Sequence, residues 1–190
     1  MLRVSLAFAR LAAIALFATL AGSVGAQGMP ATGEDVPARL EPPADSVLLF
    51  ELGARGVQIY ACEAEPDNAT TYVWTFKAPE AELLNARGEV VGSHYAGPTW
   101  EVLDGSTVVA AVVDRAGAPD PDAIPWLLLV AKERASNGVF SMITHIQRLA
   151  TVGGIAPSAG CDGDHVGEVA RVPYEATYAF FYPFYPSELA

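Results

Sequence analysis

Short runs of β-branched and aromatic residues, separated by Gly, Pro, Asn and Asp, fill most of this chain of 190 residues and restrict it to a β fold. The clearest run is Tyr72–Lys77, in which aromatic residues alternate with Val, Thr and Lys. Side chains alternate between the two faces of a strand, so we expect a strand there that buries its aromatic face. Tyr174–Tyr182 alternates in the same way. No segment carries a sustained 3.6-residue stripe, and only Ala78–Leu84 fits a short helix.

Turn-forming residues separate the other predicted strands. A hairpin over Leu83–Tyr95 turns at Asn85–Glu89, and Asp104-Gly105 and Asn137-Gly138 mark two more turns. The remaining predicted strands are Val47–Leu52, Val57–Cys62, Thr99–Leu103, Thr107–Val113, Trp126–Ala131, which is apolar on both faces, and Val139–Leu149. This pattern predicts an all-β fold with little helix, an antiparallel β-sandwich or barrel of roughly nine short strands.

Residues 1–26 have the composition of a cleaved signal peptide. Arg3 and Arg10 supply a positive start, Leu11–Leu20 is an uncharged run, and small residues end the segment at Ala26. The apolar run is shorter than the roughly 20 residues that a membrane-spanning helix needs. We therefore expect an exported protein, periplasmic or extracellular, with no membrane span in the mature chain.

Composition divides the mature chain into three parts. Residues 27–45 are rich in Pro and Gly and predict a flexible arm, residues 46–182 form a single β domain, and residues 183–190 are an aromatic, Pro-containing tail. The net charge of −11 favours solubility and repels nucleic acid and anionic lipid surfaces, so we expect no nucleic-acid partner. None of these features predicts an oligomeric state.

Cys62 and Cys161 are the two cysteines of the chain. Two cysteines in an exported protein predict one disulfide, with a single possible pairing. Cys62 ends a predicted strand and Cys161 lies in a Gly/Ser-rich loop, so the bond would attach that loop to the sheet. A reactive or metal-binding thiol is the alternative, and it fits an oxidising compartment less well.

The densest group of polar and aromatic side chains lies in Val91–Gly105. A bend at Gly97-Pro98 would bring His94 and Glu101 together as a general acid–base pair. Neighbouring aromatic rings would offer flat surfaces to a sugar or an aromatic ligand. The candidate ligand-binding residues of this stretch are His94, Tyr95, Trp100 and Glu101. The alternative is a structural loop in which Trp100 belongs to the core.

His145 and Gln147 share one face of a predicted strand and are further candidates for a site with His94. Polar residues in an alternating strand also commonly face water, which is the alternative interpretation. The chain lacks the spaced His and Cys motifs of metal sites, the serine-hydrolase elbow and a phosphate-binding Gly loop. We therefore assign no metal site and no cofactor.

Several longer segments closely resemble the family named domain of unknown function 3455. The matching motifs are GVQIYAC at Gly56–Cys62, WTFKAPEA at Trp74–Ala81, HYAGPTWE at His94–Glu101, DAIPWLLL at Asp122–Leu129, IQRLATVGG at Ile146–Gly154, GC at Gly160-Cys161 and RVPY at Arg171–Tyr174. The resemblance extends from about Val36 to Tyr182. It implies an exported domain with both cysteines as family features, and it implies no activity.

Two functional classes follow from these observations. The first is an exported binding module that holds a small molecule, a glycan or an envelope partner. The second is an exported enzyme that uses His94 and Glu101 as acid and base on a small or carbohydrate substrate. Binding is favoured because the usual nucleophile and metal motifs are absent from the sequence.

Overall fold

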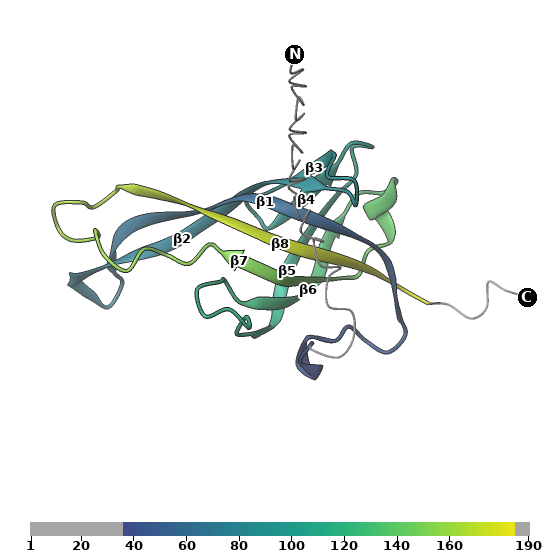
Figure 1. The fold of residues 1–190 in the computed structure, drawn as a ribbon, viewed down its shortest axis with the longest axis horizontal. Helices are drawn as coiled ribbons and strands as arrows, with labels where there is room; N and C mark the ends of the chain where they lie inside the picture. The colour runs from purple at the N-terminus through teal and green to yellow at the C-terminus, as the bar shows by residue number, and fades with distance from the viewer. Residues whose placement is uncertain (1–35, 185–190) are drawn as a thin grey trace, which may run out of the picture.

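A computed structural model, which describes residues 36–184, forms one closed barrel of eight antiparallel strands in sequence order. β8 pairs with β1 and closes the ring (Figure 1). The elements are η1 (Ala38–Leu40), β1 (Ser46–Glu65), β2 (Asn68–Leu84), β3 (Val90–Tyr95), β4 (Thr99–Val102), β5 (Thr107–Ala116), β6 (Trp126–Arg134), η2 (Val139–Met142), β7 (His145–Gly153) and β8 (Val169–Pro183). The predicted all-β fold is confirmed, and of the two predicted architectures it is the barrel. The predicted signal peptide and the tail beyond Phe184 lie outside the described residues.

Besides small shifts of strand ends, the structure corrects three of the predicted elements. β1 is a single strand where two were predicted, because Gly56 continues the strand at a close approach: a Cβ there would lie 2.1 Å from the Glu80 carbonyl oxygen. Ala78–Leu84 is not a helix but the end of β2, paired with both β1 and β3. The segment Val139–Leu149 begins as η2, and the strand starts only at His145.

Aromatic rings fill the barrel interior beside η2. Phe140 of η2 packs against Phe180 of β8 with ring centroids 4.9 Å apart, and Phe50 of β1 lies 5.1 Å from Phe180. Phe140 and Phe180 are fully buried. The interior is therefore packed solid at this level of the barrel, and any open space lies further along the strands.

The segment before β1 packs on the outside of the barrel. Leu40 is fully buried in an outer cluster that contains Trp126 and Leu128 of β6 and Leu149 of β7. The Gln147 side-chain amide donates a 2.6 Å hydrogen bond to the Leu40 carbonyl. Residues 36–45, the described part of the predicted flexible arm, are thus attached to the sheet, and β6 is covered on both faces as its apolar sequence predicts.

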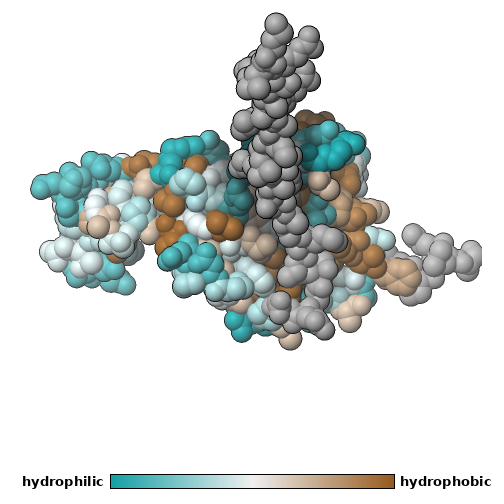
Figure 2. Space-filling model, viewed as in Figure 1, coloured by the Kyte–Doolittle hydropathy of each residue, from teal (hydrophilic) through white to brown (hydrophobic). Residues whose placement is uncertain are grey.

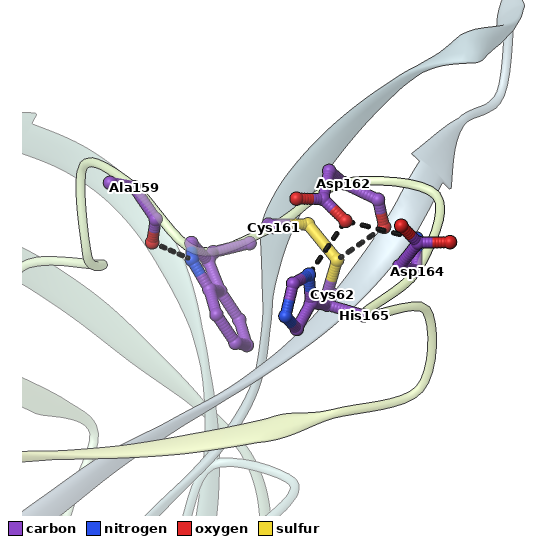
Figure 3. Close-up of a disulfide and its surroundings, with 7 residues drawn as sticks. Cys62, Ala159, Cys161, Asp162, Asp164 and His165 are labelled. Carbon is purple, nitrogen blue, oxygen red and sulfur yellow. Dashed lines mark hydrogen bonds and ion pairs between the residues drawn. A yellow bond between two sulfur atoms is a disulfide. The ribbon is translucent and has the colours of Figure 1, made fainter.

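The β1–β2 hairpin projects beyond the barrel together with the connection between β7 and β8 (Figure 1). The predicted disulfide is present: it joins Cys62 in β1 to Cys161 in that connection, with the two Cα atoms 5.3 Å apart (Figure 3). The Trp74 indole donates to the Ala159 carbonyl at 2.9 Å, and the Asp162 carboxylate pairs with His165 at 2.6 Å. The surface of this projecting end is mostly hydrophilic (Figure 2).

Candidate functional site

A cavity of about 350 Å³ lies inside the barrel, and side chains from all eight strands line it. We call it the lumen cavity. Phe76 of β2 and Val112 of β5 line it although they are 50% and 41% exposed, so they mark its mouth. The volume is at the lower end of the range of about 300–1,000 Å³ found for small-molecule sites. The lumen cavity therefore suits a compact ligand.

Most of the wall is apolar. Trp100 of β4 and Leu129 of β6 are buried, and Leu127 on the same face of β6 is half-buried. β4 and β6 contribute these side chains because residues two apart in a strand point to the same face. The prediction that Tyr72–Lys77 buries its aromatic face is wrong at Phe76, whose ring lies at the mouth and packs edge-on against Tyr60 at 5.7 Å.

His94 of β3 lines the lumen cavity as a neutral ring. Its Nδ1 lies 2.8 Å from the Thr99 carbonyl, which can only accept, so Nδ1 carries the proton. Burial lowers the pKa of His94 to about 3, against the opposing effect of that hydrogen bond, and the charge of Arg148 lowers the pKa further. At neutral pH the other ring nitrogen, Nε2, is therefore an unprotonated acceptor.

Three buried polar groups of the lining have no hydrogen-bond partner among the described residues. They are the Gln58 side-chain nitrogen, the Trp100 indole nitrogen and the Tyr178 hydroxyl. Each of the three residues is at most 2% exposed. Burial raises the pKa of Tyr178 against the opposing effects of the nearby Arg148 guanidinium and Tyr174 hydroxyl, so the Tyr178 hydroxyl stays protonated and can donate. A buried polar group without a partner costs about 1–3 kcal/mol, so these groups favour an occupant that bonds to them.

Arg148 of β7 brings a positive charge to the lumen cavity. It lies opposite Tyr178 of β8, and its Nε and Nη2 atoms donate to the Pro125 carbonyl at 3.1 and 2.8 Å. Among the described residues no carboxylate pairs with it. Lys77, the other cationic residue of the lining, pairs with Glu63 at 2.6 Å. The unpaired guanidinium is thus the dominant charge at the cavity.

The structure separates the four candidate residues of Val91–Gly105 into two pairs. His94 and Trp100 point into the lumen cavity. Tyr95 and Glu101 lie on the opposite face of β3 and β4, where the Tyr95 hydroxyl donates to the Glu101 carboxylate at 2.8 Å. The Gly97-Pro98 turn does bring the two strands together. However, Glu101 lies opposite Ser93, the neighbour of His94, so the side chains of His94 and Glu101 point to opposite faces of the sheet. His94 and Glu101 therefore do not meet at one site.

His145 and Gln147 lie on the outer face of β7, away from the lumen cavity. His145 contacts the Thr144 hydroxyl at 3.2 Å, and burial lowers its pKa against the opposing charge of Asp45. Gln147 bonds to the segment before β1. The inward residues of this strand are Ile146 and Arg148, so the alternation that grouped His145 with Gln147 also places Arg148 on the other face.

Sequence reasoning missed Gln58 and Arg148. Each is a polar residue on a strand face whose other members are apolar or aromatic: Gln58 alternates with Tyr60, and Arg148 with Ile146. A polar side chain on an otherwise inward-facing stripe was the available signal. The alternation in Tyr174–Tyr182 groups Tyr178 with Tyr174 and Phe180, and this face is buried in the barrel. Tyr178 was nevertheless not recognised as a site residue.

Within residues 36–184 no three His, Cys, Asp or Glu side chains gather closely enough to hold a metal ion. In the same part of the chain no helix has both the length and the hydropathy to cross a membrane.

Comparison with known protein families gives one match. The family described as protein of unknown function (DUF3455) matches residues 43–182, which include nearly the whole barrel from the start of β1 to the penultimate residue of β8. This confirms the resemblance in the sequence motifs. Comparison with curated proteins and with solved structures gives no match.

Proposed function

We propose that this chain, which belongs to the DUF3455 family of proteins of unknown function, is an exported protein that binds a compact small molecule in its lumen cavity. The observation that carries the proposal is the combination of an apolar wall with buried polar groups that have no partner. Ligand sites are commonly of this kind, mostly apolar with a few convergent polar groups that orient the ligand.

The rigidity of the wall supports the same function. The rings of His94, Trp100 and Tyr178 contact one another, with centroids 4.2 to 5.2 Å apart. Each ring is held by the other two, and His94 is also fixed by its bond to Thr99. A wall that is already ordered before binding avoids the entropic cost of ordering side chains around a ligand.

A glycan or a catalytic role fits the lumen cavity less well. The hydroxyl groups of a buried glycan need protein hydrogen-bond partners in place of water, whereas most of this wall is aliphatic or aromatic. Catalysis by His94 and Glu101 as an acid–base pair requires both at one substrate, and they occupy opposite faces of the sheet. We therefore favour binding over the enzyme that was the second hypothesis.

Export is part of the proposal. The composition of residues 1–26 supports it, because that segment has the positive start, apolar run and small final residues of a signal peptide. The Cys62–Cys161 disulfide is compatible with an oxidising compartment, where such bonds form and persist.

Native mass spectrometry of the protein purified from its own host tests the binding function. We expect a small molecule to be retained at one equivalent. Val112→Trp, which places a large side chain at the mouth, should abolish retention. Val113→Trp is the matched control, because Val113 is next in sequence and exposed but does not line the lumen cavity. Equal retention by both variants, or no bound molecule in the wild-type protein, would argue against the proposal.

A further inference from the structure

We infer that the lumen cavity selects a small organic monoanion, with an aromatic or compact apolar body and one carboxylate that lies at Arg148. The inference rests on the proposed function and specifies the chemistry of the ligand. It is carried by the charges and the hydrogen-bond donors of the lining.

The charges of the lining favour an anion. No Asp or Glu is among the described residues that line the lumen cavity, and His94 is neutral. Lys77 is already neutralised by Glu63, which leaves Arg148 as the cation without a counter-charge. Arg148 is partly withdrawn from water, which favours pairing of its charge, and the guanidinium fork matches a carboxylate or a phosphate. An anionic ligand would supply the missing partner.

The three buried groups of the lining that lack a partner point to the same chemistry. The indole nitrogen of Trp100 and the amide nitrogen of Gln58 can only donate, and the Tyr178 hydroxyl can donate as well. An ionised carboxylate only accepts, through about four lone-pair sites on two oxygens. A ligand rich in donors would leave these buried groups without partners, which costs about 1–3 kcal/mol for each group.

A single carboxylate fits better than a phosphate. A phosphate monoester carries a charge of about −1.5 to −2 at neutral pH and calls for more than one cation. The lumen cavity offers one unpaired guanidinium, which already uses Nε and Nη2 to hold the Pro125 carbonyl. Its remaining N–H groups match the two oxygens of one carboxylate.

The acidic surface of the protein does not oppose this selection at short range. The net charge of −11 repels anions at a distance, but salt screens exposed charges beyond about 8 Å at physiological ionic strength. Inside the barrel the nearest unpaired charge is that of Arg148. The preference for an anion is therefore a property of the lining and should persist at moderate salt.

Isothermal titration at pH 7 with benzoate, benzamide and benzylamine tests the inference, because the three probes share one apolar ring and differ in charge. We expect benzoate to bind the wild-type protein at least about tenfold more tightly than benzamide, and benzylamine most weakly. Arg148→Gln should remove the advantage of benzoate over benzamide. Arg148→Lys keeps the charge without the planar fork, so an intermediate preference is expected.

The outcomes separate the inference from the proposed function. Equal binding of benzoate and benzamide would overturn the anion preference and leave the lumen cavity as a binding site. Benzoate binding that survives Arg148→Gln in a folded variant would also overturn it. Failure of all three probes to bind the wild-type protein would overturn the inference, whereas the molecule retained by the protein from its own host decides the proposed function independently.

Discussion

The imidazole of His94 stacks on the indole of Trp100, with ring centroids 4.2 Å apart and planes inclined by 14°. The two residues lie directly opposite each other in β3 and β4, so the register of the hairpin sets the stack. Tyr178 of β8 packs edge-on against both rings from across the barrel. This arrangement gives the lumen cavity a flat aromatic wall whose polar atoms, on His94, Trp100 and Tyr178, are fixed in place.

The buried neutral His94 should make stability depend on pH. The unfolded chain protonates this ring near pH 6.5, whereas in the folded protein burial lowers its pKa to about 3. Between these values the unfolded state binds more protons, so stability falls as the pH is lowered from about 6.5. From pH 7 to pH 5 we expect the wild-type protein to lose up to roughly 2 kcal/mol more unfolding free energy than His94→Asn.

Urea unfolding of both proteins at the two pH values measures this difference. His94→Asn is the suitable comparison because its side-chain nitrogen can still donate to the Thr99 carbonyl but does not titrate. Acid effects from other groups act on both proteins and cancel. Parallel losses of stability in the two proteins would contradict the assignment of a neutral, buried imidazole.

Gln147→Leu should loosen the segment before β1 and leave the lumen cavity intact. The substitution removes the donor to the buried Leu40 carbonyl, which costs about 1–3 kcal/mol of unfolding free energy. Faster cleavage by trypsin after Arg39 would report the release, and unchanged benzoate affinity would separate this role from ligand binding. A variant that loses affinity while its cleavage rate stays the same would return Gln147 to the ligand-binding candidates.

The disulfide should stabilise the fold, but the barrel should form without it. Cys62→Ala combined with Cys161→Ala opens a covalent loop of 99 residues, and the loss of a native disulfide from a small secreted domain typically costs about 2–5 kcal/mol. Denaturant unfolding measures this loss, and amide exchange should rise mainly in residues 154–168. The barrel should remain closed because β1 and β8 pair from Ser46 and Pro183 to Ala61 and Val169, independently of the disulfide. Equal stability of the double variant and the wild-type protein would refute the prediction.

The fold class could be predicted from the sequence because alternation and turn residues are local properties. The turn at Asn85–Glu89 is confirmed: the backbone N–H of Asn85 donates to the backbone carbonyl of Glu89 at 3.0 Å, and Gly88 has a φ of 75°. The closure of β8 on β1 could not be predicted, because it joins residues more than a hundred positions apart. The strands Val47–Leu52 and Val57–Cys62 were predicted separately for the same reason, since the close neighbour that Gly56 accommodates belongs to another strand.

The candidate site was predicted in part. Grouping residues by nearness in sequence found His94 and Trp100, but it added Tyr95 and Glu101, which the alternation of the strands sends to the outer face. Gln58, Arg148 and Tyr178 come from three other strands, and only the closed barrel brings them to one cavity. The alternation within one strand shows which of its residues share a face. It does not show which strands are neighbours, and the pairing of the strands decides which inward-facing residues meet in the barrel.

Tyr178→Phe should separate stability from binding. The Tyr178 hydroxyl is buried without a partner, so its removal should stabilise the empty protein by about 1 kcal/mol while the ring contacts with His94 and Trp100 remain. A ligand at 100 times its Kd stabilises the wild-type protein by about 2.7 kcal/mol, and the variant should gain less because it lacks one donor. Melting with and without benzoate measures both effects.

Tyr60→Phe is the matched control for Tyr178→Phe. The Tyr60 hydroxyl donates to the Gly154 carbonyl at 2.6 Å, so this variant should lose stability with or without benzoate. Destabilisation of the empty protein by Tyr178→Phe would mean that the hydroxyl is already satisfied, and the reason for assigning it to a ligand would be lost.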